Sequence, residues 1–209
     1  MDKKKYIEIL SSEAEKNGRP QESALDDFLD YVIDYFDVKS LQSGMDSYGD
    51  HILEQMRKSH GFFNLVIMWL QDVAKAMECG EWLDVFGILY EEMYLSRGKA
   101  SRTGQFFTPQ CVSDLMAQTI DTGKECGTVN DCASGSGRLL LAHYISKSRT
   151  DHYAGRRFKY VAQDCDPIAC KMCACNMMAH GMYGMVICQN TLTTVSYTHL
   201  RAHETTLHL

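Results

Sequence analysis

A seven-residue loop is the part of the sequence best suited to hold a charged ligand. It runs Asp131-Cys132-Ala133-Ser134-Gly135-Ser136-Gly137, directly after a short strand pattern and directly before a helix pattern. Glycines let the backbone pass close to a ligand because no Cβ stands in the way. The following helix would present free N–H groups and a partial positive charge, which suit the carboxylate of an amino-acid-like cofactor. The alternative interpretation of the loop is a plain tight turn.

Two further segments could complete such a site. Asp164 ends the next strand pattern, at the point where a parallel sheet places the acid that binds a ribose. Taken alone, Asp164 is more typical of a cap for the helix that begins at Pro167. The segment Gln105-Phe106-Phe107-Thr108-Pro109-Gln110 puts aromatic side chains beside a helix start, which alone is typical of a helix entry with a hydrophobic staple.

The elements that must position these residues change in kind along the chain. In the first half, apolar residues recur at helical spacing and predict helices at 21–38 (with Ser23 as N-cap), 50–58, 62–77 and 82–95. The polar, basic and glycine-containing stretch at 96–104 predicts a loop, where we place a domain boundary.

The second half of the chain alternates between strand and helix patterns. A helix should begin at Pro109, with Thr108 as its N-cap. The strands that we expect after it are 127–131, 159–163 and 184–188, and the helices between them are 138–148 and 167–180. Because the links are short, this alternation predicts a parallel α/β sheet.

Composition excludes several classes of protein. The formal net charge of −6 argues against a protein that coats nucleic acid along its whole surface. No apolar run approaches a membrane span of roughly 20 residues, and the first residues lack the apolar segment of a signal peptide. The nine cysteines show no disulfide framework and are expected to be reduced thiols. We therefore expect a cytoplasmic protein with no membrane partner.

In order and spacing, four motifs resemble those of the methylation subunits of type I restriction-modification systems, which are N6-adenine DNA methyltransferases. The Gly104–Pro109 segment resembles their Gly-Gln-Phe/Tyr-Phe-Thr-Pro signature, and Asp131–Gly137 resembles their Asp-Pro-x-x-Gly-Ser-Gly loop. Gln163–Pro167 together with Asn176–Gly181 resembles their Gln-Glu-x-Asp-Pro…Asn-Met-x-x-His-Gly segment. Asp84–Glu91 resembles the helix that precedes the first signature, and the match runs from about residue 82 to 192.

The resemblance implies a fold, a cofactor and partners. The fold would be α/β, with a helical N-terminal domain over 1–100 and the first half of a Rossmann-like methyltransferase sheet over 101–195. The cofactor would be S-adenosyl-L-methionine. Its binding residues would be Gln105, Phe106, Phe107, Thr108, Pro109, Gln110, Asp131, Ala133, Ser134, Gly135, Gly137, Asp164 and Asn190. The substrate would be double-stranded DNA and the partner a DNA-specificity subunit, and whether a restriction subunit joins them stays open.

The resemblance also implies a role for each part of this set. The 105–110 segment would line the methionine part of the cofactor, and Ala133, Ser134 and Gly135 would contact it through their backbone. Asp131 would help to fix its ammonium group. Asp164 would bind the ribose hydroxyls, and Asn190 would bind the adenine amine.

The sequence departs from the family pattern in specific places. Cys132 stands where proline is usual, Asp164 where glutamate is commoner, and Asn190 where many members have an acid. These changes bear on cofactor affinity. The family's catalytic Asn-Pro-Pro-Phe/Tyr motif holds a flipped-out adenine, and it is absent because the three prolines of the chain are isolated from one another. We therefore expect an inactive fragment of an adenine methyltransferase, with no catalytic residue of its own.

The last 14 residues, Ser196–Leu209, lose the apolar period of the preceding segments. They also resemble the peptide made when sequencing-adapter DNA is translated. We predict a non-native tail.

Two other functions and a metal site are weaker interpretations. A nicotinamide-dependent oxidoreductase would need a third glycine where Leu140 stands, and an acid nearer to the loop than Asp164. A non-catalytic protein that binds S-adenosylmethionine or a partner stays open. The cysteines at 165, 170, 173 and 175 and the histidines at 199 and 203 have metal-like spacing, but a single Cys-x-x-Cys on a helix is a weak signal. We predict no metal site.

Overall fold

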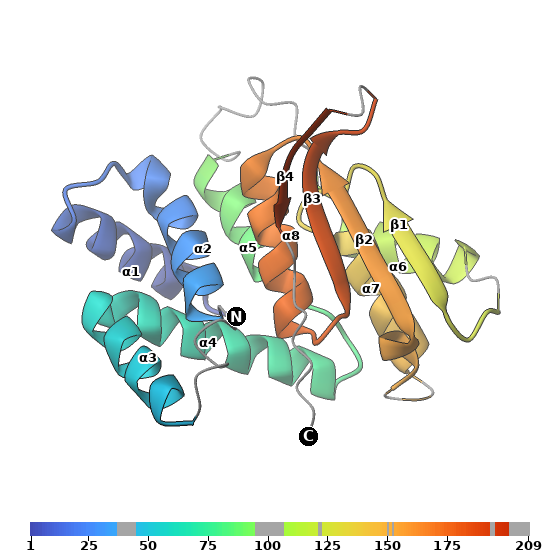
Figure 1. The fold of residues 1–209 in the computed structure, drawn as a ribbon, viewed down its shortest axis with the longest axis horizontal. Coiled ribbons are helices and arrows are strands. Elements are labelled where there is room, and N and C mark those ends of the chain that lie inside the picture. Colours follow the sequence, from blue (N-terminus) through green and yellow to red (C-terminus); the bar gives the residue numbers. More distant parts are fainter. Residues whose placement is uncertain are drawn as a thin grey trace.

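A computed structural model describes residues 1–36, 45–94, 107–120, 123–149, 151, 153–192 and 195–200. For 45–49 and 195–200 it describes the backbone alone. The helices of the first half of the chain gather at one side of the molecule, and a small sheet with further helices beside it lies at the other (Figure 1). Among the described residues, no helix is both long enough and apolar enough to span a membrane.

The first half of the chain is helical, as its periodicity predicts. Its elements are α1 (Lys3–Lys16), the 3-10 turn η1 (Gln21–Ser23), α2 (Ala24–Tyr35), α3 (Met45–Lys58), α4 (His60–Glu78) and α5 (Val85–Tyr90). Ser23 lies at the cap position of α2, but its hydroxyl donates to the Pro20 carbonyl and to Asp27 instead of capping the helix. The fourth predicted helix begins later than expected, because the Asp84 side chain accepts from the Gly87 N–H and starts α5 there. The predicted loop at 96–104 lies outside the described residues, so the domain boundary stays a prediction.

The second half forms the expected parallel sheet. Its strands are β1 (Gly127–Asp131), β2 (Phe158–Asp164) and β3 (Gly184–Asn190), and neighbouring strands pair in parallel in that order. The helices around them are α6 (Gln110–Ile120), α7 (Arg138–Ser148), the 3-10 turn η4 (Ala154–Arg157) and α8 (Pro167–Ala179). Each predicted strand and helix is present within a few residues of its expected bounds. The fold is thus a partial Rossmann-like sheet behind a helical region.

A fourth strand follows the three parallel ones. Residues Val195–Leu200, β4, pair antiparallel with β3, with a register irregularity between Cys188 and Gln189. The apolar period of the earlier elements is lost over these residues, and the sequence alone did not predict a strand. A strand next to β3 is possible without such a period, since backbone hydrogen bonds to a free sheet edge do not depend on side-chain type.

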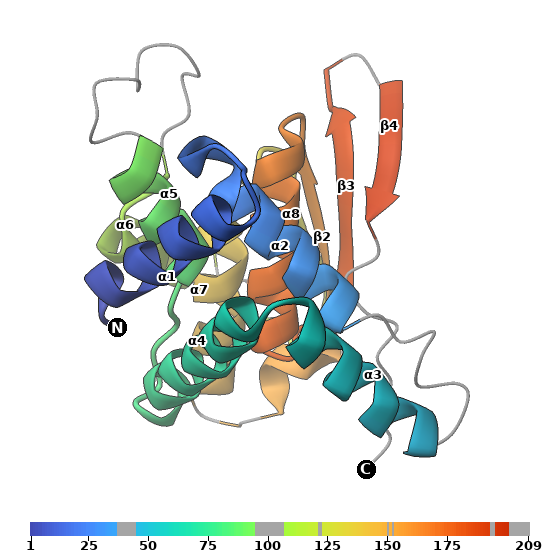
Figure 2. The same cartoon turned by 90° about the vertical axis from the view of Figure 1, so that its left-hand side faces the viewer.

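Helix α8 joins the helical region to the sheet. One set of its residues, Ala169, Met172 and Cys175, is buried in the core formed by α1, α2, α4 and α5. Another set, including Cys170, Cys173 and Met177, is buried against the sheet and α7. Figure 2 shows α8 between α2 and the strands. A helix that is apolar on all sides is stable only when it is buried all round, and this position provides that burial.

Candidate cofactor-binding site

The glycine loop lies where the sequence predicts it, between the carboxyl end of β1 and the start of α7. Gly135 and Gly137 have left-handed backbones, with φ of 53° and 92°. The Ser134 N–H donates to the Gln163 carbonyl at 2.9 Å, and the Gly137 N–H donates to the Ser134 carbonyl at 2.8 Å. The loop is therefore a closed turn that is held to the end of β2.

Asp164 meets this loop, as the parallel topology requires. Its Oδ2 accepts from the Gly135 N–H at 2.8 Å, and its Oδ1 accepts from the Asp166 N–H at 3.0 Å. Each oxygen keeps a lone pair beyond these bonds. The carboxylate is thus fixed at the carboxyl edge of the sheet, and it can still accept hydrogen bonds from a pair of hydroxyls.

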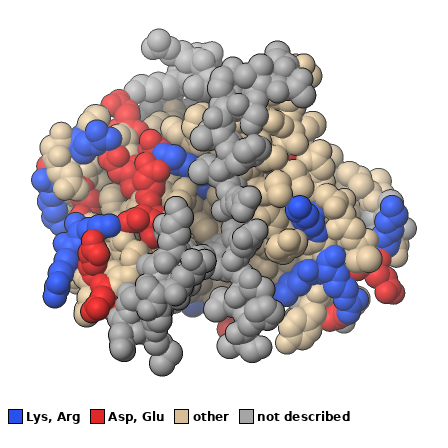
Figure 3. All heavy atoms as spheres, viewed as in Figure 1, with Lys and Arg blue, Asp and Glu red and all other residues tan. Residues whose placement is uncertain are grey.

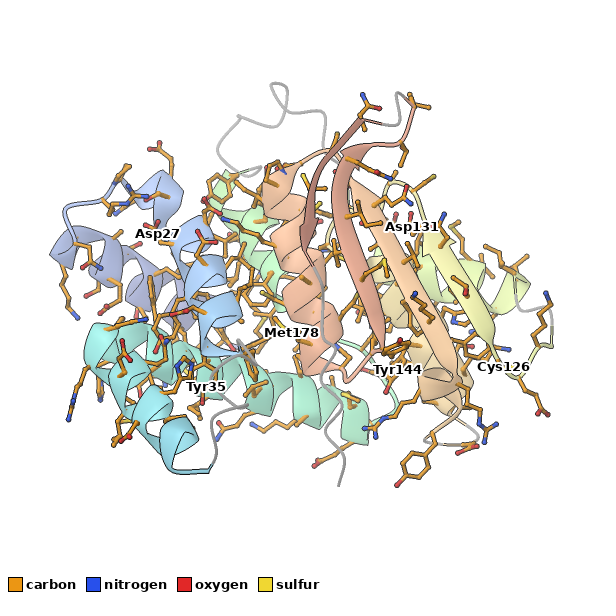
Figure 4. The ribbon with its side chains drawn as sticks, in the orientation of Figure 1. Asp27, Tyr35, Cys126, Asp131, Tyr144 and Met178 are labelled. Atoms are coloured by element: carbon orange, nitrogen blue, oxygen red, sulfur yellow. The ribbon has the colours of Figure 1, made fainter. Side chains whose placement is uncertain are left out.

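Asp131 is one of two polar groups of this loop, with the Ser134 hydroxyl, that lack a full set of partners among the described residues. Its Oδ1 accepts from the Ala133 N–H at 3.1 Å, while its Oδ2 is buried with no hydrogen-bond partner among the described residues. Burial raises the pKa of this carboxyl, the Ala133 N–H partly offsets that rise, and the charge of Asp164 adds to it. Figure 4 shows Asp131 at the opposite end of β1 from Cys126. A cationic ligand group at this edge would supply the missing partner.

The aromatic segment before α6 reaches the same loop through Phe107. A Cβ added at Gly135 would lie 3.3 Å from the Phe107 ring, so the ring rests against the glycine. Tyr90 contacts the other side of the ring edge-on, with centroids 5.5 Å apart. Gln105 and Phe106 lie outside the described residues. A side chain at position 135 would push Phe107 away, which explains the need for glycine there.

The remaining predicted residues lie near the site with other partners. The Pro109 carbonyl accepts from the Val112 and Ser113 N–H groups at the start of α6. The Gln110 amide donates to the Trp82 carbonyl at 3.4 Å, which leaves its carbonyl oxygen for a ligand. Asn190 ends β3 and its Oδ1 accepts from the Leu192 N–H at 3.0 Å. The structure therefore brings Phe107, Asp131 and Asp164 together at the loop, with Asn190 one strand further away.

A buried ionic network behind the loop escaped the sequence analysis. Its centre is Asp84, whose Oδ2 accepts from Ser136 Oγ at 2.5 Å and from Arg138 Nε at 2.6 Å. Its Oδ1 accepts from the Gly87 N–H and from Asn176 Nδ2. Burial opposes the charge of Arg138, but Asp84 and Glu91 outweigh it, so the pKa of the guanidinium lies above its usual value. The sequence feature that could have indicated this network is the acidic residue at the start of the Asp84–Glu91 motif.

His180 fixes the same helical region to the far end of α8. Its Nδ1 lies 2.7 Å from the Asn176 carbonyl oxygen, and its Nε2 lies 3.4 Å from the Leu83 N–H. Because the carbonyl needs a donor and the N–H needs an acceptor, the ring is neutral with its proton on Nδ1. Burial lowers the pKa of His180 to about 4, in agreement with a neutral ring. The Asn176 and His180 motif residues are thus anchors of the helical region.

Three of the four cysteines that have metal-like spacing lie in the core, and Cys165 is exposed. Cys170, Cys173 and Cys175 are buried in α8, and burial raises the pKa of each thiol. No group of three or more histidine, cysteine or acidic residues suited to a metal occurs in the described part of the chain. These thiols pack as small apolar side chains.

A parallel sheet with a glycine loop after one strand and an acid after the next defines the class of Rossmann-like cofactor-binding proteins. Within that class, a family model for N-6 DNA methylases matches residues 82–206, and the chain belongs to this family. The resemblance inferred from the motifs is confirmed.

One curated relative and one solved structure are similar to parts of the chain. Over 122 residues the chain is 35% identical to the type I restriction enzyme MpnII methylase subunit of Mycoplasma pneumoniae, a match that covers 54% of this chain and 21% of that protein. The chain thus spans about a fifth of the length of this curated relative. A crystal structure of a type I restriction-modification methyltransferase subunit from Streptococcus thermophilus aligns with a TM-score of 0.39 at 16% identity. The alignment covers 87% of this chain and 58% of that one.

Proposed function

We propose that the carboxyl edge of the sheet binds S-adenosylmethionine. The observation that carries the proposal is the Asp131 Oδ2 at the glycine loop, which has no partner among the described residues and lies next to the fixed carboxylate of Asp164. Asp131 would accept from the ammonium of the methionine part, and Asp164 would accept from the ribose hydroxyls. Phe107 would cover the methionine part from the side of α6, and Asn190 would bind the adenine amine. When bound, the cofactor supplies an electrophilic methyl group.

The reaction that we propose for the whole protein is N6-methylation of adenine in double-stranded DNA, as part of a restriction-modification system. Family membership supports the reaction type. The relative is a subunit of a type I restriction enzyme, which supports partner subunits in a complex, and we propose a DNA-specificity subunit as one of them. On the face shown in Figure 3, lysine and arginine side chains of the described residues are dispersed among other residues rather than gathered on one surface. A partner subunit that holds the DNA would fit this distribution, and we propose a cytoplasmic location for the complex.

The 209-residue chain alone is proposed to bind the cofactor without methylating DNA. The sequence holds no Asn-Pro-Pro-Phe/Tyr motif to grip a flipped adenine. Orientation of reacting groups can contribute roughly 7–11 kcal/mol to a rate enhancement, so its loss should abolish turnover. Transfer of a radiolabelled methyl group to unmethylated duplex DNA tests this, with a complete methylase–specificity complex as control. Turnover by the chain alone would show that its catalytic residues are misassigned.

The binding proposal is tested by calorimetry on a matched pair of variants. Asp164→Ala should weaken S-adenosylmethionine binding by about 1–3 kcal/mol, because the ribose hydroxyls lose a charged acceptor. Asp166→Ala is the control, since Asp166 lies two residues away and caps α8. Equal affinity of the parent and Asp164→Ala would remove Asp164 from the site.

A further inference from the structure

Arg138 is the first residue of α7. Its guanidinium bonds to Asp84, to Glu91 and to the Thr108 carbonyl, which are all distant in sequence. Nε donates to Asp84 at 2.6 Å, Nη1 donates to Glu91 Oε1 at 3.0 Å, and Nη2 donates to Glu91 Oε2 at 3.1 Å. Nη1 also donates to the Thr108 carbonyl at 3.2 Å. The side chain is only 10% exposed. A planar guanidinium suits this arrangement because its donors point in fixed directions.

The same guanidinium lies over the aromatic segment of the site. Its central carbon is 5.2 Å from the centre of the Phe107 ring, within the range of a cation–π contact. Phe107 is therefore held between Arg138, Tyr90 and the bare backbone of Gly135. The Thr108 carbonyl bond fixes the backbone of the next residue.

We propose that Arg138 is a positioning residue that holds Phe107 and Thr108 against the glycine loop. Asp84 and Glu91 orient the guanidinium from the start and the end of α5, so cofactor affinity depends on how the helical region is docked. This proposal rests on the proposed function for its link to cofactor affinity, while the position of Phe107 can be measured without any cofactor.

A purely structural role for Arg138 is the competing explanation. Removing one partner from a buried ion pair leaves an uncompensated charge and destabilises the fold. Thermal stability alone therefore cannot separate the two roles. The position of Phe107 and the coupling between Arg138 and Phe107 can separate them.

Three variants carry the experiment. Arg138→Met removes the cation from the segment. Glu91→Gln removes one orienting charge at a partly exposed position, 37% exposed, where the fold tolerates the change more easily. Arg156→Met is the matched control, because Arg156 also lies over an aromatic ring, Tyr153 at 5.6 Å, beside the η4 turn and away from the glycine loop.

The first measurement is chymotrypsin cleavage after Phe107, located by mass spectrometry and done without cofactor. Release of the segment should speed this cleavage about tenfold or more in Arg138→Met and about threefold in Glu91→Gln, as expected for the loss of charge-assisted hydrogen bonds. Arg156→Met should match the parent. If Arg138→Met does not fold, Glu91→Gln decides alone. Cleavage at the parent rate in the folded variants would overturn the proposal.

The second measurement is the affinity for S-adenosylmethionine in a double-mutant cycle with Phe107→Ala. If Arg138 acts through Phe107, the double variant should bind no more weakly than Phe107→Ala alone. Additive losses would assign Arg138 a structural role and overturn the proposal. If the parent chain itself does not bind the cofactor, the proposed function fails for this chain and the cleavage rates still decide the role of Arg138.

Discussion

Two turns in the sheet lead from a strand into the next helix. Residues 132–137 connect β1 to α7, and Cys165 and Asp166 connect β2 to α8. The N-terminus of helix α8 is capped. The Asp166 side chain accepts from the Ile168 N–H at 2.9 Å, and Pro167 has no N–H that needs a partner. Helix α7 begins after Gly137, which provides no side-chain cap.

This difference is the one expected if the first turn serves the proposed cofactor and the second turn serves the fold. The first turn contains two left-handed glycines and stands next to Asp131, whose Oδ2 has no partner among the described residues. In the second turn, the Asp166 side chain accepts from the Ile168 N–H. A side-chain cap stabilises a helix whether or not a ligand is bound. A helix start without such a cap leaves backbone N–H groups that can bind an anion. Variants of the two turns should therefore have separable effects on binding and stability.

The largest effect is expected from Gly135→Val in the first turn. A side chain in the left-handed region costs about 1–2 kcal/mol, and crowding against Phe107 adds about 1–3 kcal/mol. Both stability and cofactor affinity should fall. Gly181→Val is the control, because Gly181 is also left-handed, with φ of 67°, and its nearest neighbour is the end of the Arg156 side chain. Chemical denaturation measures the stability of both variants, and calorimetry should show weaker cofactor binding only for Gly135→Val. A similar loss of affinity in Gly181→Val would contradict the proposed difference between the two turns.

The second effect concerns the far end of α8, where His180 closes the helix. Burial lowers the pKa of His180 from 6.5 to about 4, so the unfolded chain binds its proton more tightly than the fold does. The stability that this residue contributes is present above pH 6.5 and is lost as the pH falls towards 4, by about 3 kcal/mol in all. Urea unfolding of the parent and of His180→Asn over this pH range should isolate the contribution of His180, because the carboxyl groups titrate in both proteins. Parallel pH curves would show that His180 is not buried neutral.

The third prediction is that Asp131→Asn raises the stability of the fold and weakens cofactor binding. Asp131→Asn removes a buried carboxylate whose pKa is raised by burial and by Asp164. Because the folded pKa is raised, the charge destabilises the fold at neutral pH and ceases to do so below the ordinary pKa of 3.8. The variant should therefore melt at a higher temperature at pH 7 and bind S-adenosylmethionine more weakly, by about 1–3 kcal/mol. A variant that loses stability at pH 7 would show that Asp131 already has a partner in the fold.

The smallest effect is expected from Asp166→Ala in the second turn. Loss of the cap should cost about 1 kcal/mol of stability, measured by urea unfolding at neutral pH. Cofactor affinity should stay at the parent value, because the Asp166 side chain accepts from α8 itself. A fall in affinity as large as that of Asp164→Ala would mean that both turns serve the ligand.

The sequence alone determined the order of the main elements from α2 to β3 and the residues of the glycine loop. Strands, helices and their short links depend on side-chain period and on glycine, proline and acidic residues within a few positions. The meeting of Asp164 with the loop also followed, because parallel strands place their carboxyl ends at one edge. These local signals explain why the predicted bounds of β1 and α7 agree with the structure.

Only the tertiary structure decided what holds that site together. Arg138 meets Asp84 and Glu91 across 54 and 47 positions of sequence, and neither pairing has a local period that could predict it. The roles of Asn176 and His180 as anchors of the helical region, and the pairing of β4 with β3, were also visible only in three dimensions. Such contacts depend on how the buried surfaces and charges of separate elements pack together. The local sequence of one segment does not specify which distant segment it will contact.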